Sequence, residues 1–588
     1  MSKENKLIIG SIVAVVIMAI GFTYAYFAAI IEGNGKNITI NMTDLRIIFN
    51  GGDTIEGSNL YSEDNFDVVK TFTIENKTKS EYKYNLVIED LVNTTVTSGS
   101  LVYKITCDDT NGYNMTEFKD LPKANNYNVG LAYNIPIASK SLQTYTIEIK
   151  YINKENEDQS IDMGSTLSGK LFIEKGSNPS LTYKMLNDNP TRAIRTDFNV
   201  TNTANTTGTL YQTNKTEDGN TVYYYSGNTT NNWVKFGKES RTSCTYNGKE
   251  VRYYDSINKA LRYTNSEEEC ISTNICKQVE PTNRYYVGYT EEQCKNKGSV
   301  FVYSSDKATY NSINDVDIYW RIIRTNEEGS VRLLYSGNSL DTKEGYIKAN
   351  VFYDNVSDDP MYVGYMYGTS GSLANNRTNE NSSFIKTNID TWYESNLFTN
   401  YDKYISKSAI YCNDRSIGDG SYSLIDFFAF GIMRLASGYP SYKCGANASG
   451  GLFETADVAD KFSASTTGGG NGQLTYPIAL MTADEITFAG GSFINDLSSP
   501  DTWYYTNSLG NSITGSNNWY TISPIGKISN RYYGVAIVYG SNGAGKLNNE
   551  YLENAVRPAI SLSSCVKIAS GDGTPDNPYV IDYENSCS

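Results

Sequence analysis

The stretch DIYWRIIRTNEEGSVRLLYSG, residues 317–337, predicts a β-hairpin. Two runs rich in apolar and β-branched residues flank the polar sequence NEEG (326–329), and this arrangement is typical of a β-hairpin. We expect Trp320 and Ile322 of this hairpin to face the core. Apolar residues much later in the chain are expected to join the same core, namely Val535, Ile537 and Val556.

Three strings near the C-terminal end predict further short strands joined by turns rich in Gly and Asn. They are NNWYTISP (517–524), YYGVAIVYGSNGAGKL (532–547) and NAVRPAISL (554–562). With Trp320-Arg321-Ile322-Ile323 and Trp519, the closing string Val556–Leu562 resembles the C-type-lectin-like fold, in the branch shared with formylglycine-generating enzymes and related bacterial surface domains. The resemblance covers residues 207–237 and 318–588, and it implies an α+β head that presents variable loops for binding.

Two short segments of this region show helical rather than alternating spacing. In SSFIKTNIDTWYESNLF (382–398) four apolar residues recur at helical spacing: Ile385, Ile389, Trp392 and Leu397. They predict an amphipathic helix with one buried face. Further on, Thr482 and Glu485 have the spacing of a capping box, so a short helix is expected to begin there and to end at Gly490.

Residues 238–317 interrupt the head and are predicted to form a cysteine-rich insert. The segment YTNSEEEC (263–270) is echoed by YTEEQC (289–294), and each copy has the pattern of a capped acidic helix start that ends in Cys. We interpret the insert as a small disulfide-stapled knob, either a decorated loop or a separate binding unit. Four cysteines allow three pairings, and the sequence does not choose among them: Cys244, Cys270, Cys276 and Cys294.

The other cysteines are expected to pair with their neighbours along the chain. Cys412 with Cys444 and Cys565 with Cys587 are the predicted bonds, because no other cysteine lies between the members of either pair. Cys107 is alone in its region and is the expected odd thiol. The chain has no CxxC pair, which argues against zinc-ribbon and thioredoxin-like sites. Disulfides of this kind indicate an oxidising compartment.

The absence of histidine excludes several classes of catalysis. A Ser-His-Asp or Cys-His nucleophile and a His-ligated zinc are impossible in this chain. The fold resemblance suggests a copper-binding cysteine pair, for which Cys412 and Cys444 would be the candidates, but no matching motif surrounds them. The oxygen-rich string SGDGTPDNPYVID (570–582) lacks the spacing of a calcium loop and is interpreted as a turn. We therefore predict no catalytic residue, no metal and no cofactor.

Residues 32–176 predict an all-β sandwich of the jelly-roll or immunoglobulin-like kind. Several short alternating strands are separated by turns rich in Asn, Gly, Ser and Lys. The strings FTYAYF (22–27), KTFTIEN (70–76) and GKLFI (169–173) resemble the TasA/camelysin family of bacterial matrix and surface proteins. This resemblance implies a secreted jelly-roll module that polymerises into fibres, whereas the plainer interpretation is an extracellular β-sandwich spacer.

The N-terminal segment 1–31 predicts a membrane anchor. Residues 7–31 carry no charge and are long enough to cross a bilayer as a helix. Lys3 and Lys6 precede them, so the N-terminus is expected in the cytoplasm and the chain after Glu32 outside the cell. The alternative is a cleaved secretory signal, which is disfavoured because the apolar core is longer than 7–15 residues and the small residues near its end lie beside aromatic ones.

The remaining features concern the linker and the partners. Residues 177–206 are predicted to be a linker with one short helix, in SLTYKMLNDNP (180–190). The net charge is −15, so nucleic acid is not an expected partner. We predict a non-enzymatic, adhesin-like surface protein that presents a protein- or glycan-binding head on a β-sandwich stalk. The alternatives are a matrix or fibre subunit that self-assembles through the sandwich and, more remotely, an oxidoreductase of the formylglycine-generating type.

The predicted binding surface is the segment Ser516–Tyr533 of the head. It is rich in aromatic and amide side chains, and Tyr, Trp and Arg dominate binding hot spots. Trp519 is also a candidate for the core, and Arg531 with one outward-facing tyrosine is the preferred pair. The candidate ligand-binding residues are Asn518, Trp519, Tyr520, Asn530, Arg531, Tyr532 and Tyr533.

Overall fold

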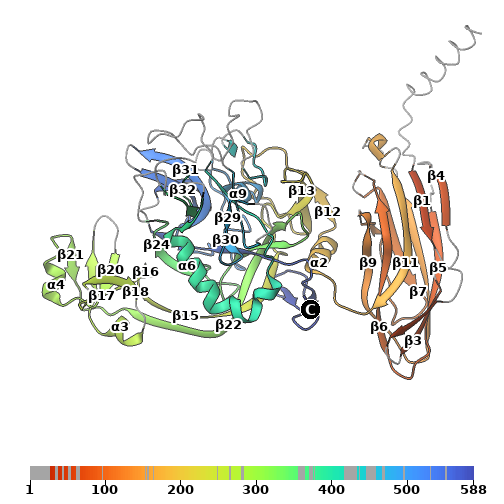
Figure 1. The fold of residues 1–588 in the computed structure, drawn as a ribbon, viewed down its shortest axis with the longest axis horizontal. Coiled ribbons are helices and arrows are strands. Elements are labelled where there is room, and N and C mark those ends of the chain that lie inside the picture. Colours follow the sequence, from red (N-terminus) through yellow and green to blue (C-terminus); the bar gives the residue numbers. More distant parts are fainter. Residues whose placement is uncertain are drawn as a thin grey trace, which may run out of the picture. The chain divides into compact units, whose positions relative to one another are not determined.

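The computed structural model describes 27–32, 38–42, 45–50, 55–60 and most of 67–587. The gaps in the last range are 96, 98, 123, 153, 155–157, 163–164, 248, 258, 264–265, 280–283, 355–363, 370–374, 376–377, 416–433, 436–437, 445–458, 466–469, 494–496, 530–531 and 550–552. The chain divides into two compact units, residues 1–179 and 180–588, which we call the sandwich and the head (Figure 1). Both consist mostly of β-sheet.

The sandwich contains two sheets. In order across the first sheet, the strands are β4 (Ile55–Leu60), β1 (Phe27–Glu32), β11 (Thr166–Lys175), β6 (Tyr82–Asn93) and β9 (Ala124–Ile137). Across the second they are β2 (Ile38–Met42), β3 (Leu45–Asn50), β5 (Asp67–Asn76), β10 (Leu142–Tyr151), β7 (Leu101–Cys107) and β8 (Lys119–Asp120). A 3₁₀ turn, η1 (Ser160–Asp162), precedes β11.

Strand alternation explains why these two sheets face each other. Along β10 every second side chain is buried, and Tyr145 and Ile147 enter a core that also contains Leu86 of β6 and Leu171 of β11. Phe72 of β5 stacks on Tyr145 with ring centroids 5.0 Å apart. Both sheets contribute side chains to one apolar core. The predicted β-sandwich is therefore confirmed as a domain of two facing sheets.

The first described strand changes the prediction for the N-terminal segment. Strand β1 pairs in parallel with β11, from Ala28 opposite Thr166 to Glu32 opposite Lys170, and antiparallel with β4. Residues 27–31, predicted to end the membrane-spanning helix, are therefore part of a sheet. The rest of that predicted span, 7–26, lies outside the described residues. In the part of the chain that is described, no helix is long and apolar enough to span a membrane.

The predicted hairpin is present at the centre of the head. Strand β22 (Thr309–Thr325) pairs with β23 (Val331–Tyr335), with Thr325 opposite Val331. The turn closes through a hydrogen bond from the Asn326 N–H to the Ser330 carbonyl, and Gly329 has φ +82°, a conformation that favours glycine. The hairpin prediction is confirmed, and all five predicted core residues are at most 1% exposed.

The closing string pairs directly with this hairpin. Strand β35 (Pro558–Leu562) lies antiparallel to β23, with Leu333 opposite Ile560, and β30 (Ile478–Leu480) pairs with the other edge of β35. The long sheet continues on the far side of β22. Its strands, in order from one edge, are β12 (Thr191–Ala193), β13 (Thr209–Thr213), β14 (Val222–Tyr224), β22, β15 (Trp233–Tyr246), β37 (Tyr579–Ile581) and β36 (Ile568–Ser570).

Smaller sheets and helices complete the head. One sheet has the order β24 (Lys348–Val351), β34 (Asn554–Val556), β31 (Trp519–Ser529), β32 (Tyr532–Val538) and β33 (Gly545–Asn549). The others are β25 (Met366–Tyr367) with β26 (Asn381–Ser382), and β27 (Tyr411–Asp414), β28 (Ala459–Ser463) and β29 (Gly472–Gln473). The helices are α2 (Leu181–Asp188), α6 (Phe384–Tyr393), the π-turn η3 (Glu394–Phe398), α7 (Thr399–Tyr401), η4 (Asp402–Tyr404) and α9 (Ala483–Phe488).

The two helices predicted within the head form as expected. Helix α6 buries Ile385, Ile389 and Trp392, and η3 continues its buried face with Leu397. Thr482 and Glu485 make both hydrogen bonds of a capping box at the start of α9, each 3.0 Å long. Both helix predictions are confirmed, because each helix has an apolar face to bury or a side chain that satisfies its free N–H groups.

The predicted linker 177–206 is instead largely part of the head. Helix α2 begins at the N-cap Ser180, as predicted, and ends before Pro190. Its Leu181 and Met185 are at most 1% exposed and belong to the main core of the head, and β12 pairs with β13. A segment that buries apolar residues and joins a sheet is not a free spacer.

The insert is carried on a long ribbon. Figure 1 shows β15 and β22 running out of the head toward a separate sheet, with the order β18 (Ala260–Tyr263), β17 (Arg252–Asp255), β20 (Arg284–Val287), β19 (Cys276–Gln278) and β21 (Phe301–Tyr303). Strand β16 (Lys249–Glu250) and helices α3 (Glu267–Ile271) and α4 (Glu291–Lys295) accompany it. Since β15 and β22 cross residues 238 and 317 without a break, the insert has no sharp boundary there.

Disulfides staple the insert and two other places in the head. The insert bonds are Cys244–Cys270 and Cys276–Cys294, which selects one of the three possible pairings. Both bonds expected elsewhere, Cys412–Cys444 and Cys565–Cys587, are present. Cys107 is a free, half-buried thiol in the sandwich.

Candidate functional site

The segment predicted to bind ligand forms the β31–β32 hairpin, and its Trp519 and Tyr520 side chains lie in the core of the head. Strand β31 pairs with β32, and Trp519 and Tyr520 are 1% and 0% exposed. The Trp519 ring lies beneath the Arg557 guanidinium, 4.7 Å from its centroid. The Asn518 side chain accepts a hydrogen bond from the Gly540 N–H. Trp519 and Tyr520 therefore stabilise the fold and are not available to a ligand. For Trp519 the core position considered from the sequence is the correct one, and for Tyr520 the predicted binding role is wrong.

The other candidates of that segment are less informative. Tyr532 and Tyr533 begin β32 and are paired with Ser529 and Lys527 of β31. Their side chains, like Asn530 and Arg531 as a whole, lie outside what the structure describes. A binding role for these four residues stays a prediction.

A different part of the head contains a polar cleft of about 370 Å³. It lies where the β15–β22 ribbon leaves the head, between β15, the segment that leads into β24, and the helix α6 with η3. We call it the ribbon cleft. Its lining residues are Ser240, Arg241, Thr242, Ser243, Thr245, Glu344, Tyr346, Ile347, Lys348, Ala349, Thr387, Asn388, Thr391, Trp392, Ser395 and Asn396.

Cross-links between the three segments hold the ribbon cleft in shape. The Ser240 N–H donates to the Asn396 side-chain oxygen at 2.8 Å, which joins β15 to η3. Arg241 Nη1 donates to the Tyr346 carbonyl at 2.7 Å and to the Ile347 carbonyl at 3.3 Å. These bonds join β15 to the segment that leads into β24. The walls are thus connected by hydrogen bonds between side chains and main chain, which a ligand does not have to create.

A buried carboxylate fixes the aromatic part of the lining. Glu239 is 1% exposed, and it accepts hydrogen bonds from Trp392 Nε1 at 3.1 Å and from the Tyr335 hydroxyl at 2.6 Å. Arg241 Nε lies 3.7 Å from the same carboxylate. Burial, together with the negative charge of Glu239, raises the pKa of Tyr335 well above its usual value. Tyr335 therefore remains a neutral donor, and Trp392 is held in one orientation.

The hydroxyls of the helix wall present oxygen atoms rather than hydrogens. The Thr387, Thr391 and Ser395 hydroxyls recur every fourth residue, and each donates its hydrogen to the main-chain carbonyl four residues earlier. Asn388 and Asn396 each donate one amide hydrogen in the same way and keep a second one. A carbonyl can only accept, so the direction of these bonds is certain. The side-chain oxygens of this wall consequently remain acceptors, and that of Asn396 already accepts from Ser240.

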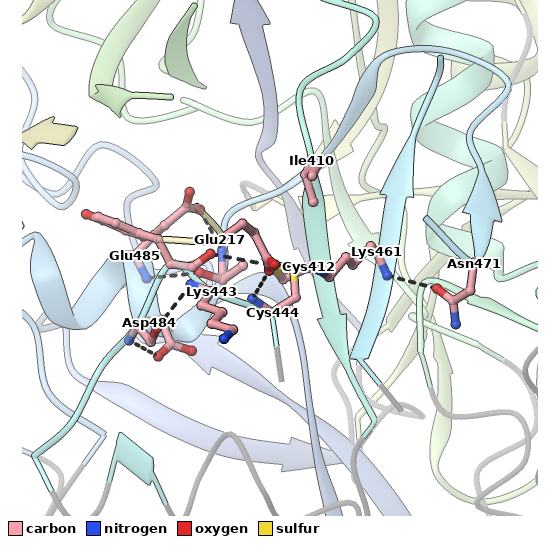
Figure 2. Close-up of a disulfide and its surroundings, with 12 residues drawn as sticks. Glu217, Ile410, Cys412, Lys443, Cys444, Lys461, Asn471, Asp484 and Glu485 are labelled. Carbon is pink, nitrogen blue, oxygen red and sulfur yellow. Dashed lines mark hydrogen bonds and ion pairs between the residues drawn. A yellow bond between two sulfur atoms is a disulfide. The ribbon is translucent and has the colours of Figure 1, made fainter. Parts of the chain in front are cut away.

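A second cavity, of about 280 Å³, lies beside the Cys412–Cys444 disulfide. Figure 2 shows Glu217 next to this bond, where its carboxylate accepts from the Cys444 N–H at 2.6 Å and pairs with Lys461. Arg434 and Asp484 form a buried ion pair nearby, 2.6 Å apart. Since both sulfurs are in the bond, this pair offers no thiolate to a copper ion, and its surroundings are those of a structural cross-link.

The turns that were considered for metal binding are occupied by local hydrogen bonds. The Asp572 carboxylate accepts from the N–H and hydroxyl of Thr574, as expected of a turn, and Asp582 accepts from Asn585. No group of three or more Cys, Asp or Glu residues in the described ranges is arranged to hold a metal ion.

Comparison with known proteins does not assign a family. No family model matches the chain, and no curated protein matches it. Among solved structures, a chain described as "AvmM Catalyzes Macrocyclization in Alchivemycin A Biosynthesis" is matched over 25% of this chain and 100% of its own length. The identity is 7% and the TM-score 0.12, so the match carries no inference about fold or function.

The ribbon cleft was not predicted from the sequence, although one wall left a signal. Thr387, Thr391 and Ser395 are spaced at i, i+4 and i+8 on the polar face of a helix whose apolar face was recognised. The opposite wall, on β15, precedes this helix by about 150 residues along the chain, and nothing local connects the two.

Proposed function

We propose that this chain is a non-enzymatic protein of the cell surface, and that its head binds an extracellular ligand in the ribbon cleft while the sandwich acts as the stalk. A C-type-lectin-like class for the head and a membrane anchor within residues 7–26, ahead of strand β1, are parts of the same proposal. The four disulfides of the described chain support it, because such bonds persist mainly outside the cytosol.

The single observation that carries the binding role is the ribbon cleft itself. Its volume lies within the range of small-ligand sites, about 300–1,000 Å³. Its walls belong to a helix and a long strand rather than to loops alone, and cross-wall hydrogen bonds hold them together. A preformed site of this kind binds without a large ordering cost.

Location is tested by protease treatment of intact cells. We expect the region after Glu32 to be digested while cytoplasmic proteins remain intact. Protection of both the sandwich and the head until lysis would contradict the surface proposal.

The binding role is tested by blocking the cleft without assuming the chemistry of the ligand. The variant Thr391→Trp places a large side chain in the cleft, and Thr399→Trp places the same side chain at an exposed position of α7 that does not line it. Full-length wild-type protein is screened against glycans and host surface proteins, and each ligand found is then measured with both variants. We expect Thr391→Trp to abolish binding and Thr399→Trp to retain it. Equal binding by both variants would place the site elsewhere.

A structural role is the second candidate, and strand edges favour it. Strands β4 and β9 end one sheet of the sandwich, and β2 and β8 end the other. An open strand edge is a template for pairing with another chain. Electron microscopy of the purified full-length protein separates the two roles, since regular fibres without ligand binding would favour a matrix subunit.

A further inference from the structure

We propose that the ribbon cleft takes a neutral, hydroxyl-rich glycan and binds it without a metal ion. The inference rests on the proposed binding function and adds the chemical class of the ligand. Three features of the cleft support it: the direction of its hydrogen bonds, its balance of charge, and its aromatic surface.

The hydroxyl hydrogen bonds of the helix wall favour a ligand that donates. Thr387, Thr391 and Ser395 use their single hydroxyl hydrogen on carbonyls of their own helix, which leaves three hydroxyl oxygens as acceptors along one side. The Asn388 amide uses one of its two hydrogens in this way, so it can both donate and accept. A sugar ring carries several hydroxyl groups in a small volume, and each hydroxyl both donates and accepts. A peptide offers one N–H per residue, and its carbonyl oxygens would face further oxygens on this wall.

The opposite wall supplies groups that complement the remaining capacity of sugar hydroxyls. Thr242, Ser243 and Thr245 of β15 contribute hydroxyls at half-buried or exposed positions. A hydroxyl rotates to donate or accept as its partner requires. A ligand hydroxyl that donates to the helix wall can therefore accept from the strand wall.

The charges around the cleft balance, which favours a neutral ligand. Arg241 and Lys348 are the cationic residues of the lining, and Glu344 is its carboxylate. Glu239 lies directly behind the lining beside Arg241. The lining thus has no net charge once Glu239 is included, on a chain whose net charge is −15. An anionic sugar would meet a lining without excess positive charge and would approach a strongly negative protein.

The aromatic lining suits the apolar face of a sugar ring. Trp392 is 8% exposed and Tyr346 is 7% exposed, so each offers a limited edge of aromatic surface. Glu239 fixes Trp392, and Tyr346 receives a 3.4 Å hydrogen bond from the Asn517 amide. Rigid aromatic surface contributes binding energy at little entropic cost.

A metal ion is not needed for this recognition. Calcium takes six to eight oxygen ligands, mainly carboxylates and carbonyls. Glu344 is the carboxylate among the described lining residues, and the remaining polar lining consists of hydroxyls, amides and cations. Recognition therefore comes from hydroxyl and amide oxygens directly.

The test measures binding of neutral oligosaccharides, acidic oligosaccharides and unrelated peptides to the full-length protein, each with and without EDTA. Thr391→Val keeps the shape of the side chain and removes its acceptor oxygen, while Thr399→Val makes the same change outside the cleft. We expect a neutral glycan to bind, EDTA to have no effect, and Thr391→Val to weaken binding by about tenfold, because the ligand donor facing this position loses its acceptor. Thr399→Val is expected to bind like the wild type, and the melting temperatures of both variants show whether they fold.

Several results would overturn the inference. They are the absence of any bound neutral glycan, a preference for acidic glycans, loss of binding in EDTA, and equal affinity of a folded Thr391→Val variant and the wild type. Failure of the glycan class differs from failure of the site. A protein ligand that Thr391→Trp blocks would refute the glycan class and leave the binding function, whereas a ligand that this variant does not block would refute the ribbon cleft as the site.

Discussion

The sandwich and the head are both built mainly from strands, yet their interiors differ in kind. The core of the sandwich is aliphatic and aromatic, and in its described part only Lys70 and Asp162 are buried charged residues. The interior of the head contains buried ion pairs, among them Arg415 with Asp460, and Arg324 and Arg332 with Glu485. The buried polar groups of the sandwich are mostly uncharged and are joined by hydrogen bonds, such as those of Tyr84 with Gln143 and Tyr145, while the interior of the head depends on buried charges with specific partners.

Two buried arginines of the head show this dependence most clearly. Arg321 is 1% exposed and donates to oxygens of Asn232, Thr229 and Thr506. Arg557 is fully buried and donates to the carbonyls of Tyr335 and Tyr504. The Arg321 guanidinium lies over the Trp233 ring and that of Arg557 over the Trp519 ring. The two arginines that stood out in the sequence motifs therefore tie strands together inside the fold.

Reduction of the disulfides is expected to give the largest difference in stability between the head and the sandwich. All four described bonds lie in the head, with sequence separations of 18 to 32 residues. Each bond that closes a loop of this length stabilises by about 3 kcal/mol in the chain-entropy model. We expect a reducing agent to lower the head's unfolding transition strongly and to leave that of the sandwich unchanged, as measured by calorimetry of the full-length protein. An equal drop in both transitions would contradict the comparison.

The second effect concerns the charged interior of the head. Glu485 is 1% exposed and lies 3.1 Å from both Arg324 Nε and Arg332 Nε. Glu485→Ala leaves these guanidinium groups buried without their carboxylate, and we expect a loss of about 3–5 kcal/mol in the free energy of unfolding by urea. The matched control is Glu291→Ala, which breaks an exposed pair with Lys295 and should cost at most about 0.5 kcal/mol. Similar losses in the two variants would show that the buried triad is unimportant.

Alkaline pH is expected to weaken the head through a buried phenol. Burial raises the pKa of Tyr411 from 10 to about 12, although Arg332 opposes the shift. Because the folded pKa is the higher one, the stabilisation is complete below pH 10 and is lost as the pH rises toward 12. The loss amounts to about 3 kcal/mol, because the pKa rises from 10 to about 12 on folding. Urea unfolding across this range should give a shallower pH dependence for Tyr411→Phe, and identical slopes would disprove the assignment.

The smallest effect is expected in the apolar interior of the sandwich. Ile147 is 1% exposed and lies on β10 between Lys70 of β5 and Ile105 of β7. Ile147→Val removes one methylene group, so we expect a loss of about 0.5–1.5 kcal/mol, confined to the transition of the sandwich. A loss as large as that of Glu485→Ala would mean that the sandwich is no more tolerant than the head.

Local sequence signals predicted the individual elements well. The hairpin around NEEG (326–329), the capping box at Thr482 and the amphipathic helix α6 are all present. Each depends on residues within one or two turns of the chain, so a short window contains the needed information. At residues 27–31 the sequence predicted the end of a membrane helix, whereas the structure has a strand. An apolar run does not reveal its partners, which here are β11 and β4.

The sequence alone determined the mostly β composition, the hairpin at residues 317–337, the short helices and the presence of disulfides outside the sandwich. The tertiary structure decided which apolar residues are core and which surfaces are open. Trp519 is of a residue type common in binding sites, yet it is buried because Arg557 and the surrounding strands cover its ring. The ribbon cleft exists only because β15 and α6, far apart along the chain, fold against each other, and no local pattern records which oxygen atoms will then share a wall.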